Sequence, residues 1–162
     1  MMKELAEYRI RLLQKLEDVA SEFRTECLKT DDPYAPLDAD GWTVHQISVH
    51  TRDVNTLVYG LRARRTALEE NPEFQTFDGE AHMAATYNPD EPLQEVLDAL
   101  VENVRALVQW LRTLPVEVWS RVSRHTTLGS GLTLQTWVEK DLGHIEEHLE
   151  ALKHKIPGAF TK

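Results

Sequence analysis

The chain has 162 residues, a length that suits one domain with an ordinary hydrophobic core, and residues 1–162 are predicted to form that single domain. Its formal net charge of −9 argues against a nucleic-acid partner, which needs clustered positive charge, and no apolar run is long enough to span a bilayer. One cysteine and the lack of a signal-peptide pattern predict a cytoplasmic protein.

The first predicted element is a long amphipathic helix over residues 3–29. Its apolar side chains recur every three or four residues, as one face of a helix requires. They are Leu5, Tyr8, Leu12, Leu16, Val19, Phe23 and Cys27. The following segment, residues 31–40, is rich in proline and aspartate, so it is predicted to be a loop.

A second helix is predicted from Thr43 to about residue 70. Thr43 as N-cap and Gln46 three residues later form a capping box, and Trp42 and Ile47 are placed to form a hydrophobic staple. The apolar stripe of this helix contains Ile47, His50, Val54, Leu57 and Leu61. The stripe places His50 on the side that faces the core.

Residues 71–91 are too long for a tight turn and are predicted to be a crossover containing a short helical turn. Pro92 opens a third helix whose apolar stripe ends at Leu111. A polar stretch over residues 123–131 leads to a fourth helix, with Thr133 as its N-cap. No segment shows the alternating apolar pattern of a strand, so the fold class is predicted to be an all-α four-helix bundle.

Three histidines suggest a metal site. His144 and His148 lie at i and i+4 of the fourth helix, on one face and about 6 Å apart along the axis. His50 is the candidate for a third ligand. Three protein ligands leave one coordination position open, as in catalytic zinc sites. Neutral imidazoles suit several transition metals, and a divalent zinc or nickel ion is the prediction.

The three histidines impose a topology. If the second and fourth helices were parallel with aligned ends, the ligands would miss one another by about 12 Å. Antiparallel packing brings them together where the second helix begins and the fourth ends. The long crossover lets the third helix run parallel to the second, which gives an up-down-down-up order. Residues 31–42, 79–91 and 154–162 are then expected to wall the pocket.

Three carboxylates are candidates for a supporting catalytic role. Asp141 lies one turn before His144 and Asp53 one turn after His50, so each is placed to orient an imidazole or approach the metal. Glu147 occupies the general-base position of an H-x-x-E-H pattern. That pattern needs a further ligand well downstream, and few residues follow His148. Ordinary surface or capping roles remain open for all three carboxylates.

The other histidines are weaker candidates. His82 in the crossover is a reserve ligand, and His45 is placed to face the mouth of the pocket. His125 is expected at the far end of the bundle and His154 off the ligand face, both on the surface.

The segment GWTVHQISVH, residues 41–50, followed far downstream by TLQTWVEKDLGHIEEH, residues 133–148, resembles the DinB/YfiT-like superfamily. The resemblance covers nearly the whole chain. It implies an up-down-down-up bundle, often a homodimer, with a divalent metal held at the positions of His50, His144 and His148. Members include thiol-dependent transferases and isomerases that use bacillithiol, mycothiol or glutathione, and others are described as metal-dependent hydrolases.

Two functions of different classes follow. The first is a metal-dependent transferase or hydrolase acting on a small-molecule substrate, in which the ion activates water or a low-molecular-weight thiol. The second is a non-catalytic helical binding or dimerisation module whose metal is structural or absent. Three histidines in an open cleft favour the enzyme, whereas a closed four-ligand site without a pocket favours the module.

Overall fold

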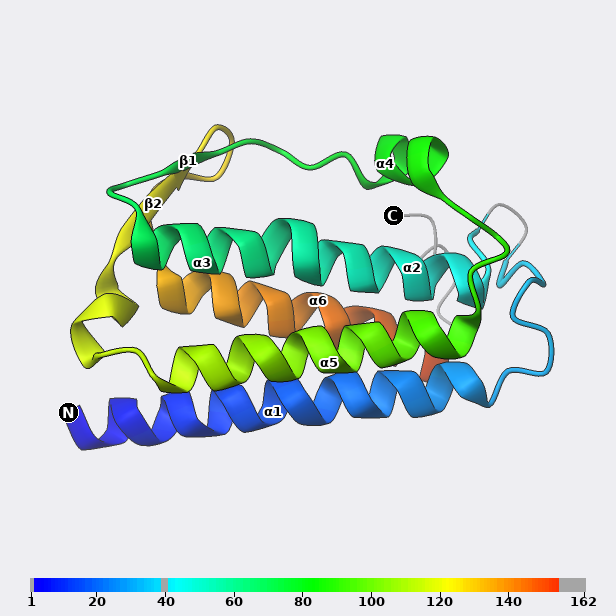
Figure 1. Cartoon of the computed structure of the whole chain (residues 1–162), viewed down its shortest axis with the longest axis horizontal. Helices are drawn as coiled ribbons and strands as arrows, with labels where there is room; N and C mark the ends of the chain where they lie inside the picture. The colour runs from blue at the N-terminus through cyan, green and yellow to red at the C-terminus, as the bar shows by residue number, and fades with distance from the viewer. Residues whose placement is uncertain (1, 39–40, 155–162) are drawn as a thin grey trace.

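The computed structural model describes residues 2–38 and 41–154. Its bundle is built from α1 (Met2–Leu28), α2 (Val44–Val54), α3 (Gly60–Leu68), α5 (Leu93–Arg112) and α6 (Leu134–His154). A π-helical turn, Asn55–Tyr59, joins α2 and α3 into one continuous helix. α1 packs against α5 and α6, and the α2–α3 helix packs against the same two neighbours. The four rods run up, down, down and up (Figure 1), as predicted.

The segment between α3 and α5 returns along the outer face of the α2–α3 helix (Figure 1). It carries a short strand, β1 (Glu73–Phe74), and a short helix, α4 (Gly79–Thr86). This return brings the chain back to the end of the bundle where α2 begins, so α5 runs parallel to α2. The predicted crossover with a helical turn is confirmed.

The predicted helix starts are also confirmed. At α2, Thr43 Oγ1 accepts the Gln46 N–H at 3.1 Å, and Gln46 Oε1 accepts the Thr43 N–H at 2.9 Å. At α6, Thr133 Oγ1 accepts the Thr136 N–H at 3.2 Å. Among the described residues, no helix is both long and apolar enough to cross a lipid bilayer.

The stripe predicted for the second helix is wrong beyond Val54. Leu57 and Leu61 are exposed, at 47% and 44%. The π-helical turn pairs the Gly60 N–H with the Asn55 carbonyl, five residues earlier, and so adds one residue to the turn. The buried face is therefore shifted by one position along α3. The buried residues are Asn55 and Val58 in the π-helical turn and Gly60, Arg62, Ala63, Thr66 and Ala67 in α3.

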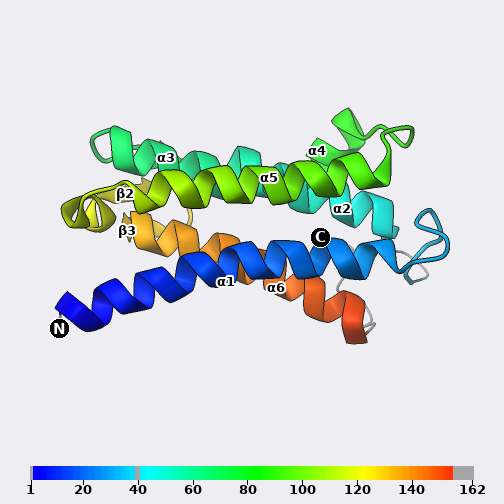
Figure 2. The ribbon, with the colours of Figure 1, turned by 60° about the horizontal axis from the view of Figure 1, so that its bottom comes forward.

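The polar stretch before α6 contains strands, contrary to the prediction. After a 3₁₀ turn (Val116–Ser120), β2 (Val122–His125) and β3 (Gly129–Thr133) form an antiparallel hairpin, and β1 pairs in parallel with β2. The sheet caps one end of α3 and α6 (Figures 1 and 2). The inward positions of β2 carry Ser123 and His125, so burial alternates while hydrophobicity does not.

Candidate metal centre

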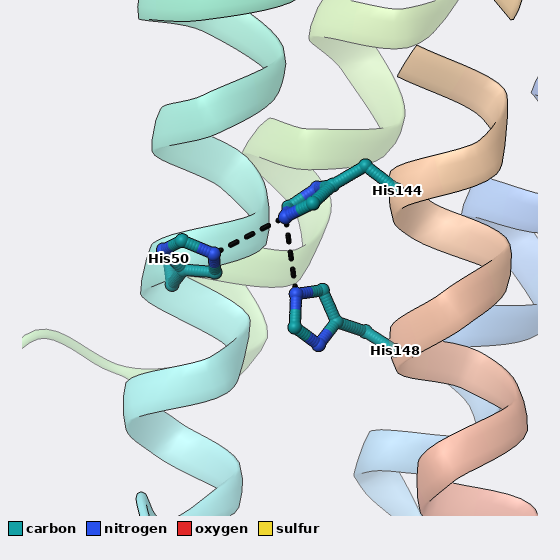
Figure 3. Close-up of side chains that lie close together, drawn as sticks. All are labelled: His50, His144 and His148. Carbon is teal, nitrogen blue, oxygen red and sulfur yellow. Dashed lines mark hydrogen bonds between the residues drawn. The ribbon is translucent and has the colours of Figure 1, made fainter. Parts of the chain in front are cut away.

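The imidazoles of His50, His144 and His148 point toward one another across the interface between α2 and α6 (Figure 3). His144 Nε2 lies 3.2 Å from His50 Nε2 and 3.0 Å from His148 Nε2. One ligand nitrogen of each residue lies within 4.8 Å of the other two. The antiparallel packing of α2 and α6 thus brings the three predicted histidines together.

Burial keeps these imidazoles neutral. Desolvation lowers the pKa of His50 to about 4. The charge of Asp53 raises this pKa, and the charge of His82 lowers it. Desolvation, followed by the charge of His50, lowers the pKa of His148 to about 3. The pKa of His144 is lowered well below its ordinary value by desolvation and by its two neighbours. A neutral imidazole is the form that binds a metal.

The spacing of the nitrogens fits one shared cation. Two imidazole nitrogens bonded to a tetrahedral zinc ion lie about 3.3 Å apart. The cluster also cannot satisfy its own hydrogen bonds, because each neutral imidazole has one N–H. Among the described residues, the buried Nδ1 atoms of His144 and His148 have no hydrogen-bond partner. These Nδ1 atoms would stay unpaired around a metal as well, but His144 Nε2 cannot serve two hydrogen-bonding partners at once, so the three Nε2 atoms fit one shared ion better than a hydrogen-bonded cluster.

His50 is held from two sides. The Trp42 ring lies 5.0 Å from the His50 ring, at an interplanar angle of 60°. On α4, the backbone of Gly79 approaches so closely that a Cβ there would lie 3.1 Å from His50 Cε1. A side chain at position 79 would push against the imidazole, so this close approach favours glycine.

The three candidate carboxylates make no hydrogen bond to the clustered imidazoles within the described part of the chain. Asp141 is buried on α6, where its Oδ2 accepts Asn55 Nδ2–H at 2.7 Å and its Oδ1 is unpaired. Burial raises the pKa of Asp141 to about 7, against the lowering effect of Asn55. Asp53 instead accepts a hydrogen bond from Arg52 Nε at 3.0 Å. Glu147 is exposed on a cavity wall.

The reserve histidines lie outside the cluster. His82 Nε2 is 3.0 Å from Asp53 Oδ2, which links α4 to α2. His45 is fully buried, with Nδ1 2.7 Å from Tyr87 Oη and Nε2 2.6 Å from the Glu91 carbonyl, so it does not face the pocket mouth. His154 is exposed and pairs with Glu150, as expected of a surface residue.

His125 lies at the far end of the bundle as predicted, because β2 is at the end where α3 ends and α6 begins (Figure 1), but the predicted surface position is wrong. It is 7% exposed on β2 and lines the same cavity as the three histidines. The hairpin of β2 and β3, which no alternating apolar pattern predicts, places His125 over the bundle. The burial of this strand depends on a contact that the sequence does not reveal, since Trp137 Nε1–H donates to Ser123 Oγ at 2.7 Å.

A cavity of about 830 Å³ opens beside the cluster. Its walls are His50, Val54, Val58, Tyr59, Arg62, Thr76, Phe77, Asp78, Gly79, Glu80, His125, Thr127, Leu128, His144, Glu147 and His148. Of the expected walls, residues 79–91 contribute Gly79 and Glu80, while the described residues of 31–42 and His154 contribute none. Residues 155–162 lie outside the described part. Sequence reasoning missed Tyr59 and Arg62 because the π-helical turn sets which way they face.

Residues 4–152 match the model of a family described as the DinB superfamily. Among solved structures, the chain is similar to YfiT from Bacillus subtilis, with a TM-score of 0.77 and 24% identity over 92% of this chain and 87% of that one. YfiT is described as a probable metal-dependent hydrolase with an unusual four-helix bundle topology. At this identity the likeness concerns the fold. No curated protein sequence matches the chain.

Proposed function

The chain belongs to the DinB superfamily, and from this premise we propose that it is a metal-dependent hydrolase of a small-molecule substrate. His50, His144 and His148 would hold one divalent ion. The observation that carries the proposal is the convergence of three Nε2 atoms on the wall of a cavity of about 830 Å³. Such a volume is within the range of small-molecule sites, roughly 300–1,000 Å³.

The donor set favours zinc or nickel. All three ligands are neutral imidazoles, which bind both ions well, whereas magnesium and calcium prefer oxygen. Three protein ligands leave a coordination position for a substrate or nucleophile. When bound, the ion would supply a Lewis acid that polarises a substrate oxygen or lowers the pKa of a nucleophile.

The chain's own residues supply the rest of the site. Tyr59 lines the cavity with its ring 5.9 Å from the His144 ring. Desolvation is the first cause of its raised pKa, so the phenol stays protonated and can donate a hydrogen bond to a substrate oxygen. Glu147 is an exposed carboxylate on the same wall and is the candidate general base. Asp141 and Asp53 are positioning candidates behind the ligands.

Thiol transfer is the second candidate. The volume of the cavity is what favours it, because a low-molecular-weight thiol such as bacillithiol, mycothiol or glutathione can occupy it together with an electrophile. The same coordination position would serve a thiolate. The rival from another class is a helical binding or dimerisation module with a structural or absent metal. The open cavity beside the ligands weighs against a closed structural site.

Metal content is the first test. Protein purified without a His tag is measured by elemental analysis as wild type and as His50→Ala, His148→Ala and His154→Ala. We expect near-stoichiometric zinc or nickel in the wild type and in His154→Ala, whose imidazole is exposed at the end of α6. The other two variants lose most of it. Equal content in all four proteins would remove the three-histidine site.

Activity is the second test. Metal-loaded protein is screened against small esters and amides, with Glu147→Gln expected to slow turnover and His154→Ala to leave it unchanged. Cobalt-substituted protein is titrated separately with each thiol, and a thiolate entering the coordination shell changes the visible spectrum. A thiol-dependent spectrum with no hydrolysis selects the transferase. Neither response in metal-loaded protein selects the binding module.

A further inference from the structure

Arg62 is a buried cation on the wall of the cavity. It lies on α3 and is 7% exposed. Its guanidinium carbon is 4.9 Å from the centre of the Trp137 ring, 5.8 Å from that of Phe74 and 5.9 Å from that of Tyr59. The aromatic rings hold the guanidinium in place from several directions, so its orientation is fixed before any ligand arrives.

No carboxylate among residues 2–38 and 41–154 forms an ion pair with Arg62. Within these residues the guanidinium of Arg62 donates one hydrogen bond, from Nη2 to the Gln75 carbonyl at 2.8 Å. Nε and Nη1 make no hydrogen bond within this part of the chain, and Arg62 lines the cavity. By contrast, Arg65 on the same helix pairs with Glu69. A buried guanidinium stays charged and is costly without a counterion.

Within the described part of the chain, the titratable groups that share the cavity with Arg62 do not form an ion pair with it. His125 on β2 is neutral, because burial and then the charge of Arg62 lower its pKa. Its Nδ1 accepts the N–H groups of Thr127 and Leu128 at 3.1 and 3.2 Å. Of the acidic wall residues, Asp78 caps α4 through the Ala81 N–H. Glu80 and Glu147 also line the cavity without pairing with Arg62.

Tyr59 connects this cation to the candidate metal centre. Its ring lies 5.9 Å from the His144 ring on one side and 5.9 Å from the Arg62 guanidinium carbon on the other. A ligand whose anionic group reaches Arg62 therefore extends along Tyr59 toward the three histidines. The separation suits a small molecule with its charge at one end and its reacting group at the other.

We propose that Arg62 binds the carboxylate of the substrate, so that the substrate is a small monocarboxylic acid whose reacting ester, amide or electrophilic carbon lies at the histidine cluster. This inference rests on the proposed function for the reacting group only. A carboxylate matches the planar donors and the single charge of one guanidinium. A phosphate dianion would add one more negative charge than a carboxylate to a cavity whose wall already carries Asp78, Glu80 and Glu147.

The test uses benzoate, with the uncharged isostere benzamide and the dianion phenyl phosphate as matched probes. Binding is measured by calorimetry on the full chain, both metal-loaded and after chelation. We expect benzoate to bind in both states and benzamide to bind at least about tenfold more weakly, as loss of a charge-assisted hydrogen bond predicts. Arg62→Gln lowers the benzoate affinity by a similar factor. Arg65→Gln, which removes an exposed arginine of the same helix, leaves it unchanged.

Two further measurements guard against an unfolded variant. Arg62→Lys keeps the charge and is expected to retain part of the benzoate affinity. In the wild type, benzoate is expected to shift the NMR resonance of the Arg62 Nε–H. Wild-type affinity in folded Arg62→Gln, equal affinity for benzamide, an unmoved Arg62 resonance, or tighter binding of phenyl phosphate would each overturn the proposal. If the protein binds benzoate but does not bind a metal ion under any condition, the carboxylate site at Arg62 is supported and the hydrolase proposal is refuted.

Discussion

The carbonyl oxygen of Asn55 occupies the space that a side chain at Gly60 would need. A Cβ built on Gly60 would lie 2.4 Å from that oxygen, which accepts the Gly60 N–H in the π-helical turn. The π-helical turn sets which side chains of α3 point toward the core and which point toward solvent. Arg62 points inward and Leu61 outward because of this one added residue.

Gly60→Ala is therefore expected to destabilise the protein, by about 1–3 kcal/mol, because the π-helical turn must shift to accept a methyl group. Gly143→Ala on α6 is the matched control, since a Cβ there meets nothing within 4 Å. In a helix that change should be neutral or stabilise by up to about 1 kcal/mol. Urea denaturation measures both, and equal effects would show that the turn does not depend on glycine.

Thr43→Ala is expected to lower the free energy of unfolding by about 1 kcal/mol, the usual cost of a lost N-cap. Thr43 Oγ1 accepts the Gln46 N–H at the start of the helix that carries His50. Thr25→Ala is the control, because the Thr25 hydroxyl only bonds back to the Ser21 carbonyl within α1. Thermal or urea unfolding compares the two variants, and a stable Thr43→Ala protein would contradict the assigned cap.

Metal removal is expected to lower the melting temperature, because the proposed ion would bind the three histidines only in the folded chain. At a free metal concentration of 100 Kd the linkage contributes about 2.7 kcal/mol. For a domain of this size that is roughly 5–10 °C. Calorimetry with and without chelator measures the shift. The shift should vanish in His148→Ala and persist in His154→Ala. If chelation leaves the melting temperature of the wild type unchanged, the ion does not contribute to stability.

Asp141→Asn is expected to change the pH dependence of stability in chelated protein. The folded-state pKa of Asp141 is raised from 3.8 to about 7, so the folded state binds more protons than the unfolded state in that window. Asp141 therefore contributes stability at low pH that is lost as the pH rises from about 4 through 7. The variant should gain on the wild type over that range, by up to about 4 kcal/mol. Parallel stability curves would refute the shift.

The fold and the clustering of the three histidines were predictable where local signals agreed with the packing. The apolar stripe of α5 is buried from Val96 to Leu111, and the capping box at Thr43 is present. The long crossover, residues 71–91, implied a parallel neighbour for α2. The i,i+4 spacing of His144 and His148 then needed only antiparallel packing to reach His50.

Most of the residues that line the cavity were not predictable from those signals. The hydrophobic periodicity gives no sign of a π-helical turn, and Gly60 is the one residue that hints at it. The single added residue of the turn moves Arg62 onto the buried face of α3. The hairpin buries Ser123 and His125, which no apolar pattern identifies. The two failures have different causes: the π-helical turn rotates Arg62 inward, while Ser123 is buried because Trp137 and the Leu132 carbonyl supply its hydrogen bonds.

The hairpin that closes the cavity belongs to no helix of the bundle. Its tip reaches the cavity through Thr127 and Leu128, and the glycines that follow, Gly129 and Gly131, have φ values of 94° and 74°. Surface loops tolerate insertions and replacements that a packed core does not. A replacement of this tip can therefore reshape the cavity wall while the three histidines and the helices that carry them stay unchanged.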